Sequence, residues 1–411
     1  MSVEDFFAKD GIKKFKNGVK AFKDKQAVRI AAATMVLSSA FGAFGALGAT
    51  DFQFSQDHES AQKVYVVHQK DTLCSFNVDT KNSADIARIQ QVVDYASKTE
   101  QGREVLQNMS KLGTTLNIDH NDGSAIGYFT PSKNSVTMNA NCSNAQLCSN
   151  IVHEGEHACQ QARLTNSMGK ISAYKYNVAD VITLERAKEA DAVATQANHC
   201  YQLMQQGDST VWNAFAQNHP TVANGYTNAV KKFANIENKT AQNDSIMKTA
   251  NLAWYEDCAY AAQYDANFIK YMSTTLNKNN GASLAQAGMA KSNLDVSKMM
   301  VAMCSGSGHS YMGTDGSILR TPQTFYLTEE CQIKATNYEH ATKSKLGYAD
   351  NSTDQMYVSC DGAIKGYTYY QEAHGITTSA KTSLQSKLQT QQKTNSLQKT
   401  IVAQNASGIA R

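Results

Sequence analysis

The chain is poor in the features that mark nucleic-acid-binding proteins and zinc ribbons. Its 411 residues carry a formal net charge of only +3 and include three prolines. So small a charge, without a basic stripe that interleaves aromatic residues outside the N-terminus, argues against DNA or RNA as a partner. The nine cysteines form no CxxC pair, which argues against a zinc ribbon or a thioredoxin-like site. Few prolines and abundant Ala, Gln and Lys instead predict a helix-rich fold.

The cysteines are spread along the chain after residue 50. They stand at Cys74, Cys142, Cys148, Cys159, Cys200, Cys258, Cys304, Cys331 and Cys360. This scatter is typical of structural disulfides in an oxidising compartment, where an odd number leaves one thiol over. The alternative is a set of buried, reduced cysteines that pack as small apolar residues.

The N-terminus predicts a contact with a membrane. Residues 30–49 contain no charged side chain and, at about 1.5 Å per residue, could span roughly 30 Å of hydrocarbon. In the lysine-rich residues 1–29, Ile12, Phe15 and Val19 recur at helical spacing, which predicts a basic amphipathic helix suited to an anionic membrane surface. We expect 30–49 to be a membrane anchor or a signal-peptide core. The rest of the chain is then membrane-tethered or exported, in a bacterial periplasm or outside the cell.

The most informative segment is His153-Glu154-Gly155-Glu156-His157, an HExxH pattern. Residues four apart lie roughly 40° from each other around a helix, so both imidazoles project from one face. Two neutral imidazoles make half of a tetrahedral Zn²⁺ site, and Glu154 can reach a water on the metal as a general base. The alternative is a solvated helical turn that carries two histidines by chance.

A third ligand is expected later in the chain, on a helix that begins near residue 180. Glu185, Glu189 and Asp191 are the candidates there. A stripe of small residues flanks Glu189 and lets this helix approach a neighbour closely, so Glu189 is the preferred ligand and Asp191 the preferred outer-shell group. In a competing arrangement Glu185 binds the metal and Glu189 braces a ligand histidine. The remaining alternative is a solvated charged face.

Apolar periodicity predicts a mainly α (α+β) fold with a small mixed sheet. Helices are expected at 83–97, 99–112 and 180–206, with further helices over 210–272. Gly127 to Asn139 is expected to form two short strands around a Pro/Asn turn. The alternation around Val136 and Met138 predicts that their strand is an edge of the sheet with one buried face.

These segments together resemble a known family. The run from Gly127 to Asn139, the segment Val152 to Gln160 around HExxH, and Glu189-Ala190-Asp191-Ala192 resemble the gluzincin peptidases. More narrowly, they resemble a bacterial family of metallopeptidases whose function is not known. The resemblance covers roughly 83–265 and is specific only at the metal motif.

The resemblance implies a zincin-like core with two metal-binding helices. His153, His157 and Glu189 would bind zinc, and Glu154 would serve as the general base that hydrolyses a peptide or protein substrate. The strand at Val136 would lie beside the cleft and pair with an extended substrate.

The domain organisation that follows has five parts. A zincin-like domain at 60–272 comes after the two N-terminal segments, 1–29 and 30–49. Residues 273–376 form a partly helical region without an expected role. The polar tail at 377–411 has few apolar residues and is expected to be disordered or loosely helical.

Two function classes fit these observations. The first is an exported or tethered zinc metallopeptidase. The second is a non-enzymatic envelope interaction protein in which the metal or disulfides are structural. An oxyanion-stabilising donor is also expected. His309 and Tyr311 qualify by chemistry alone, and a structural role is favoured for both. His199, which shares a helix with Glu189, is expected to be an ordinary helix residue.

Overall fold

The computed structural model describes the chain from residue 62 to 368 with gaps. It covers 62–68, 71–121, 125–169, 175–279, 293–306, 308–321, 323–346, 354–358 and 364–368. The predictions for 1–29, 30–49 and 377–411 fall outside these residues. Among the helices that are described, none combines the length and the apolar character needed to cross a bilayer.

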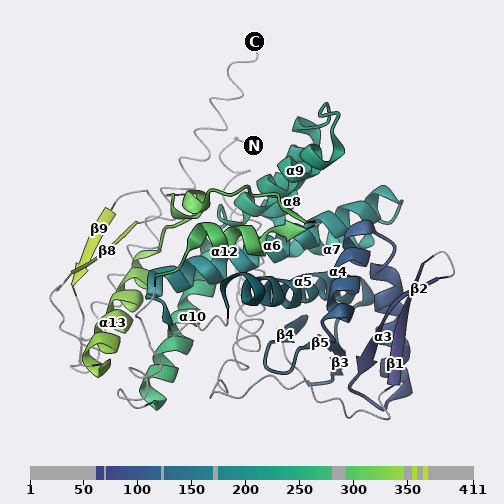
Figure 1. The fold of residues 1–411 in the computed structure, drawn as a ribbon, viewed down its shortest axis with the longest axis horizontal. Helices are drawn as coiled ribbons and strands as arrows, with labels where there is room; N and C mark the ends of the chain where they lie inside the picture. Colours follow the sequence, from purple (N-terminus) through teal and green to yellow (C-terminus); the bar gives the residue numbers. More distant parts are fainter. Residues whose placement is uncertain are drawn as a thin grey trace, which may run out of the picture.

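A five-stranded mixed sheet lies beside the central helices (Figure 1). Its order is β1 (Gln62–His68), β2 (Asp71–Val78), β3 (Thr115–Asp119), β5 (Ser135–Asn139) and β4 (Gly127–Thr130). The outer pairs β1–β2 and β4–β5 are antiparallel, whereas β2–β3 and β3–β5 are parallel. The small mixed sheet that the sequence predicts is confirmed.

β4 forms one edge of this sheet and β1 the other, so the prediction that the Val136 strand forms an edge is wrong. β5 pairs with β3 on one side and β4 on the other, and its residues from Val136 to Asn139 are all buried. The alternation of polar and apolar residues misleads here because Thr137 and Asn139 are buried as well. Asn139 donates from Nδ2 to the carbonyl of Ala125, and a polar side chain that finds such a partner can lie in a core.

Helices make up most of the described chain, as predicted for a mainly α fold. The sheet-side helices are α3 (Ser83–Ala96) and α4 (Glu100–Lys111), and the two long central ones are α5 (Asn144–Met168) and α6 (Val178–Gln205). Next come α7 (Thr210–Asn218), α8 (Pro220–Lys232), α9 (Lys239–Trp254) and α10 (Cys258–Lys278).

The helix that carries HExxH begins at a defined cap and packs closely on its neighbour. The Ser143 hydroxyl accepts from the backbone of Gln146, whose side chain accepts from the backbone of Ser143, a capping box that fixes the start of α5. Further along, a Cβ on Gly155 would lie 2.6 Å from Val105 Cγ1 and 2.4 Å from Met109 Sδ. The glycine between the two histidines thus lets α4 lie directly against α5.

The small-residue stripe on α6 is buried as predicted. Ala187, Ala190, Ala194 and Ala197 are all nearly inaccessible to solvent, and α6 packs along α5. Small side chains permit close approach of the two helix axes. The stripe therefore brings the acidic side chains of α6 within reach of the histidines on α5.

The C-terminal elements belong to the same hydrophobic core as the sheet. They are α12 (Val296–Met303), the short strands β6 (Ser305–Gly306) and β7 (His309–Ser310), a 3₁₀ helix (Gly316–Arg320) and α13 (Glu329–Leu346). A separate hairpin pairs β8 (Asp354–Val358) with β9 (Ile364–Thr368). Buried residues from Val64 to Tyr338 form one cluster. The domain boundary near residue 273 stays a prediction.

The predicted disulfides do not form among most of the cysteines. Cys74, Cys142, Cys148, Cys159, Cys200, Cys304 and Cys331 are not bonded to one another. Five of these seven are buried, and burial raises the pKa of thiols such as Cys200, to about 12. Within this set the alternative, reduced cysteines that pack as apolar residues, describes the structure.

Candidate metal centre

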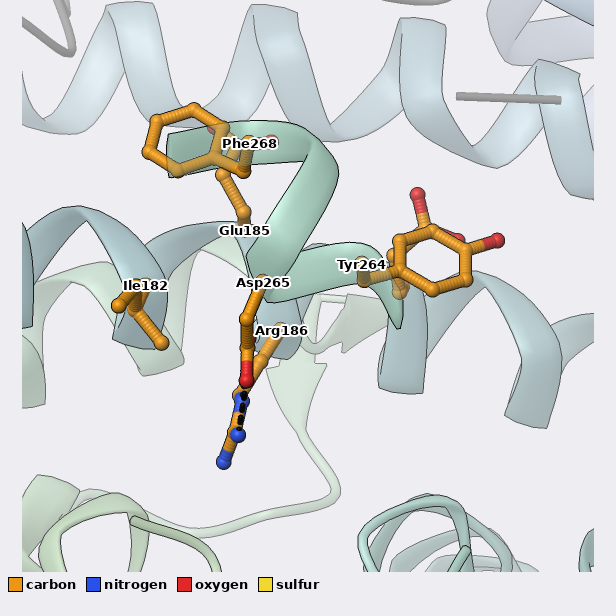
Figure 2. A pocket seen from close by; sticks show the side chains of 7 residues that line it. Ile182, Glu185, Arg186, Tyr264, Asp265 and Phe268 are labelled. Atoms are coloured by element: carbon orange, nitrogen blue, oxygen red, sulfur yellow. Dashed lines mark hydrogen bonds and ion pairs between the residues drawn. The ribbon is translucent and has the colours of Figure 1, made fainter. Parts of the chain in front are cut away.

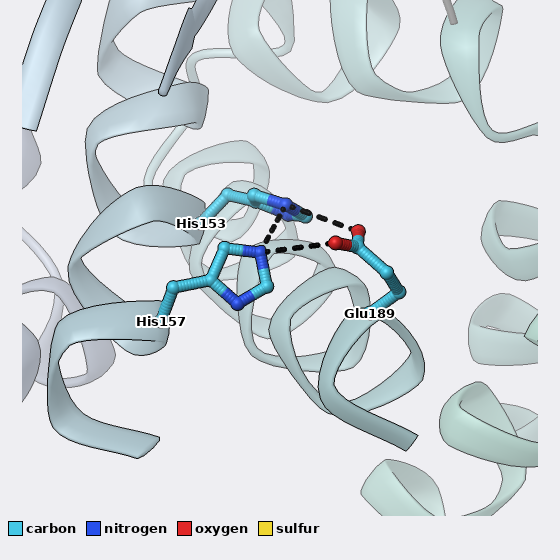
Figure 3. Close-up of side chains that lie close together, drawn as sticks. All are labelled: His153, His157 and Glu189. Carbon is cyan, nitrogen blue, oxygen red and sulfur yellow. Dashed lines mark hydrogen bonds and ion pairs between the residues drawn. The ribbon is translucent and has the colours of Figure 1, made fainter. Parts of the chain in front are cut away.

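Three side chains from the two central helices converge on one point (Figure 3). His153 Nε2 and His157 Nε2 lie 3.1 Å apart. Glu189 Oε2 lies 3.6 Å from His153 Nε2, and Glu189 Oε1 lies 3.4 Å from His157 Nε2. All three side chains are largely buried, between 8% and 13% exposed. Two consecutive helices thus present two nitrogens and a carboxylate to a shared space.

The spacing of these atoms suits a divalent metal. Zinc bonds of about 2.0–2.1 Å in tetrahedral geometry hold neighbouring ligand atoms about 3.3 Å apart, which the three separations bracket. Glu189 Oε2 is buried and has no hydrogen-bond partner among the described residues. A buried carboxylate oxygen without a partner is costly unless a cation satisfies it. The residues present therefore fit a metal ion.

The electrostatics of the three groups are coupled. Burial alone would lower the pKa of His157, but the charge of Glu189 and its hydrogen bond outweigh burial and raise that pKa to about 9. Burial would raise the pKa of Glu189, yet His157 and His153 hold it well below its usual range. The carboxylate therefore holds a proton on His157, which a metal would have to displace.

Glu154 lies next to this group and is held by two hydrogen bonds. Its Oε2 accepts from the backbone N–H of Phe129 in β4, at 2.9 Å, and its Oε1 accepts from Asn150 Nδ2, at 3.1 Å. The side chain is buried. Glu154 thus sits between the sheet edge and the histidines as a fixed acceptor.

The other two acidic candidates on α6 do not belong to the converging group. Glu185 accepts from Lys188 Nζ at 2.9 Å and lines a small cavity with Arg186 and Tyr264 (Figure 2). Asp191 accepts from Gln160 Nε2 at 2.7 Å and from the Tyr311 hydroxyl at 2.6 Å. Of the three carboxylates, the group of converging ligand atoms includes Glu189 alone.

Aromatic side chains from α10 and the α7–α8 junction lie within electrostatic range of the converging group. The hydroxyls of Tyr260 and Tyr264 lie 3.0 Å apart. Burial raises the pKa of both phenols, and the charges of Glu189 and Glu154 raise it further, so both keep their protons. Burial and then the charge of His153 lower the pKa of His219 to about 3. Two phenols and a neutral imidazole thus lie within electrostatic range of the site.

Several of these groups escape sequence reasoning for different reasons. Asn150 lies four residues before Glu154 and Gln160 three residues after His157, and helical spacing could have identified both. Tyr260, Tyr264 and His219 carry no local signal, because only the packing of α10 and α7 against α6 brings them to the site.

The histidines considered at the sequence level have other surroundings. His199 is fully buried, with Nδ1 2.6 Å from Thr99 Oγ1 and Nε2 3.5 Å from Cys148 Sγ. His309 lies 2.9 Å from Asp244 at the protein surface. Neither belongs to the group of converging ligand atoms.

Comparison with known families places this site in context. The chain matches the family described as "Putative metallopeptidase family (DUF6782)" over residues 67–298. The chain belongs to this family. The matched part contains His153, Glu154, His157 and Glu189, so it includes both helices of the converging group. No curated protein and no solved structure matched the chain.

Proposed function

We propose that this family member is a zinc-dependent peptidase in which His153, His157 and Glu189 hold the metal and Glu154 is the general base. The observation that carries the proposal is the metal-like spacing of the three ligand atoms next to the buried carboxylate of Glu154. Membership of a metallopeptidase family supports the same reaction class.

Zinc, when bound, supplies Lewis acidity that polarises a carbonyl and lowers the pKa of a water toward about 7. Glu154 takes the proton from the attacking water and passes it to the leaving amine. The bonds from Phe129 and Asn150 keep its carboxylate in one orientation during both transfers. A fixed base loses little entropy on reaching the transition state.

The phenols of Tyr260 and Tyr264 are the proposed donors to the developing oxyanion. Their raised pKa keeps both protonated, and Tyr264 lines the same cavity as Glu189. Preorganised donors in a water-poor site stabilise charge that develops in the transition state. Tyr311, a candidate at the sequence level, instead donates to Asp191.

The substrate in this proposal is an extended peptide or protein segment. β4 is an edge of the sheet, and Phe129 in that strand contacts Glu154. An extended chain that adds to a free edge presents its main chain to the neighbouring groups. The expected anchoring or export through 30–49, with the reaction on the non-cytoplasmic side, is part of the same proposal.

The decisive experiment replaces the base and leaves the ligands intact. Glu154→Gln should retain stoichiometric zinc and lose at least about 100-fold in hydrolysis of a fluorescence-quenched peptide library, because general-base catalysis contributes about 10²–10⁴. Glu185→Gln is the matched control. It changes a carboxylate on α6 that bonds to Lys188, and it should retain both zinc and hydrolysis.

Unchanged hydrolysis in Glu154→Gln would refute the mechanism. If the wild type binds zinc and cleaves no peptide, the alternative of an interaction protein with a structural metal gains support.

A further inference from the structure

The ring of His157 is held by the side-chain amide of Gln160, and this amide has only one possible orientation. Gln160 Nε2 lies 2.9 Å from the carbonyl oxygen of Lys188 and 2.7 Å from Asp191 Oδ2. A carbonyl and a carboxylate can only accept hydrogen bonds, so the amide nitrogen must face them. Gln160 Oε1 is thereby turned toward His157 Nδ1, at 2.9 Å.

This orientation decides which nitrogen of His157 carries the proton in a neutral ring. Since Gln160 Oε1 can only accept, His157 Nδ1 must be the donor. The lone pair of the neutral imidazole then lies on Nε2, the atom that faces Glu189. The chain therefore presets the tautomer that a metal requires. His153 differs, because its buried Nδ1 has no hydrogen-bond partner among the described residues.

Asp191 is held in turn by a residue from the C-terminal region. The Tyr311 hydroxyl lies 2.6 Å from Asp191 Oδ1. Asn251 Nδ2 donates to the same phenol oxygen at 3.0 Å, so the phenol proton is directed at Asp191. A second anchor comes from Arg163, whose guanidinium lies 3.8 Å from Asp191 Oδ2.

One of these contacts, that of Tyr311, comes from beyond the part of the chain that matches the family. The match ends at residue 298, whereas Tyr311 follows β7. Arg163 reaches the same region, with Nη2 2.6 Å from the carbonyl of Met303 and Nε 3.0 Å from that of Ala302. The region after 298 thus forms hydrogen bonds with Asp191 and Arg163, the residues that support Gln160 and, through it, His157.

We infer that Tyr311 is a positioning residue for the metal centre, acting through Asp191 and Gln160 to fix the tautomer and ring orientation of His157. The inference rests on the proposed function, because it gives His157 the role of a ligand. It assigns a role to the C-terminal region, for which the sequence predicts none. Outer-shell partners of this kind typically change metal affinity by about 10–100-fold.

Metal binding by the full chain tests this inference without any substrate. Tyr311→Phe removes one hydroxyl and keeps the ring. It should weaken the Kd for Zn²⁺, measured by competition with a chromophoric chelator, by about 10-fold. It should also change the visible absorption of the Co²⁺-substituted protein, which reports ligand geometry. Asp191→Asn should weaken zinc binding at least as much, since an amide at this position lets the Gln160 amide turn over.

Tyr326→Phe is the matched control. Tyr326 lies in the same C-terminal region, and its buried hydroxyl donates to the carbonyl of Tyr255, away from His157. This variant should keep the zinc affinity and the Co²⁺ spectrum of the wild type. Equal weakening in Tyr326→Phe and Tyr311→Phe would overturn the inference and indicate general loosening.

Two further outcomes separate the inference from the proposed function. Unchanged affinity in both Tyr311→Phe and Asp191→Asn would overturn the inference and leave the peptidase proposal standing. A wild type that binds neither Zn²⁺ nor Co²⁺ would overturn both.

Discussion

The two sides of the α5–α6 helix pair differ in how their buried polar groups are paired. On the side of the candidate metal centre, His153, His157 and Glu189 face one another, and Glu189 Oε2 has no hydrogen-bond partner among the described residues. On the other side, Asp191 accepts from a glutamine and a tyrosine, and Glu156 is paired with Arg163. Carboxylates of both sides are largely buried, yet among the described residues the one buried carboxylate oxygen without a hydrogen bond, Glu189 Oε2, lies on the metal side.

The difference separates a structural network from a candidate metal site. Folding normally pairs every buried polar atom, and local departures from this rule concentrate at functional sites. Burial and the nearby Asp191 raise the pKa of Glu156, to about 8, even though Arg163 opposes the shift. The network side is therefore satisfied only while its arginine is present, whereas on the other side Glu189 holds a proton on His157 that a metal cation can replace.

The largest effect on stability should come from disrupting the ion-pair network around Arg163. Arg163→Met leaves the buried Asp191 without its cation and removes the donor to Glu156, and the loss of one partner from a buried ion pair costs about 3–5 kcal/mol. The free energy of unfolding, measured by urea denaturation without metal, should fall by about that amount. Lys334→Met is the control, because its pair with Glu330 is exposed and should change stability by less than about 1 kcal/mol. Similar losses in the two variants would contradict the contrast.

The next effect should appear on the metal side and spare the fold. Glu189→Gln removes the proposed anionic ligand, so zinc binding should weaken by more than about 100-fold, beyond the range expected of an outer-shell residue. The circular dichroism spectrum of the metal-free protein should stay that of the wild type. Isothermal titration with Zn²⁺ gives the ranking against Asp191→Asn. A larger loss of affinity in Asp191→Asn would reverse the roles assigned to the two carboxylates.

The smallest effect concerns His199, a neutral group on α6 away from both networks. Burial lowers the pKa of His199 to about 3, against about 6.5 in an unfolded chain. Between these values the unfolded state binds a proton that the folded state does not, so stability falls as the pH decreases below about 6.5. His199 then contributes a slope of up to about 1.4 kcal/mol per pH unit. Urea midpoints from pH 7.5 to 5.5 should decline less steeply in His199→Gln than in the wild type. Parallel declines would show that His199 does not titrate in this way.

Local patterns predict the helices and the placement of the two histidines well. The small-residue stripe of α6 and the four-residue spacing of His153 and His157 are both properties of one helix at a time. Such properties follow from helical periodicity alone. The preference for Glu189 over Glu185 follows from the same helical wheel, and the structure places Glu189 beside both histidines.

Errors arise where a prediction depends on which elements become neighbours. Val136 has the alternation of an edge strand, yet β4 and β1 occupy the edges, because strand order depends on how the chain returns to the sheet. The cysteines suggest a disulfide framework, and seven of them remain unbonded to one another. Spacing along a chain carries no information on the distance between thiols in space.

The sequence by itself determined that two histidines and a glutamate share one helical face, and that an acidic helix with a small-residue stripe follows. Both features depend only on the 3.6-residue period of the helix. Tertiary structure alone decided that Glu189 reaches the histidines while Asp191 turns to Gln160 and Tyr311. It also decided that Tyr260 and Tyr264 lie within electrostatic range of the site. The physical reason is that the rotation and offset of packed helices are set by how all their side chains interlock, which no single segment encodes.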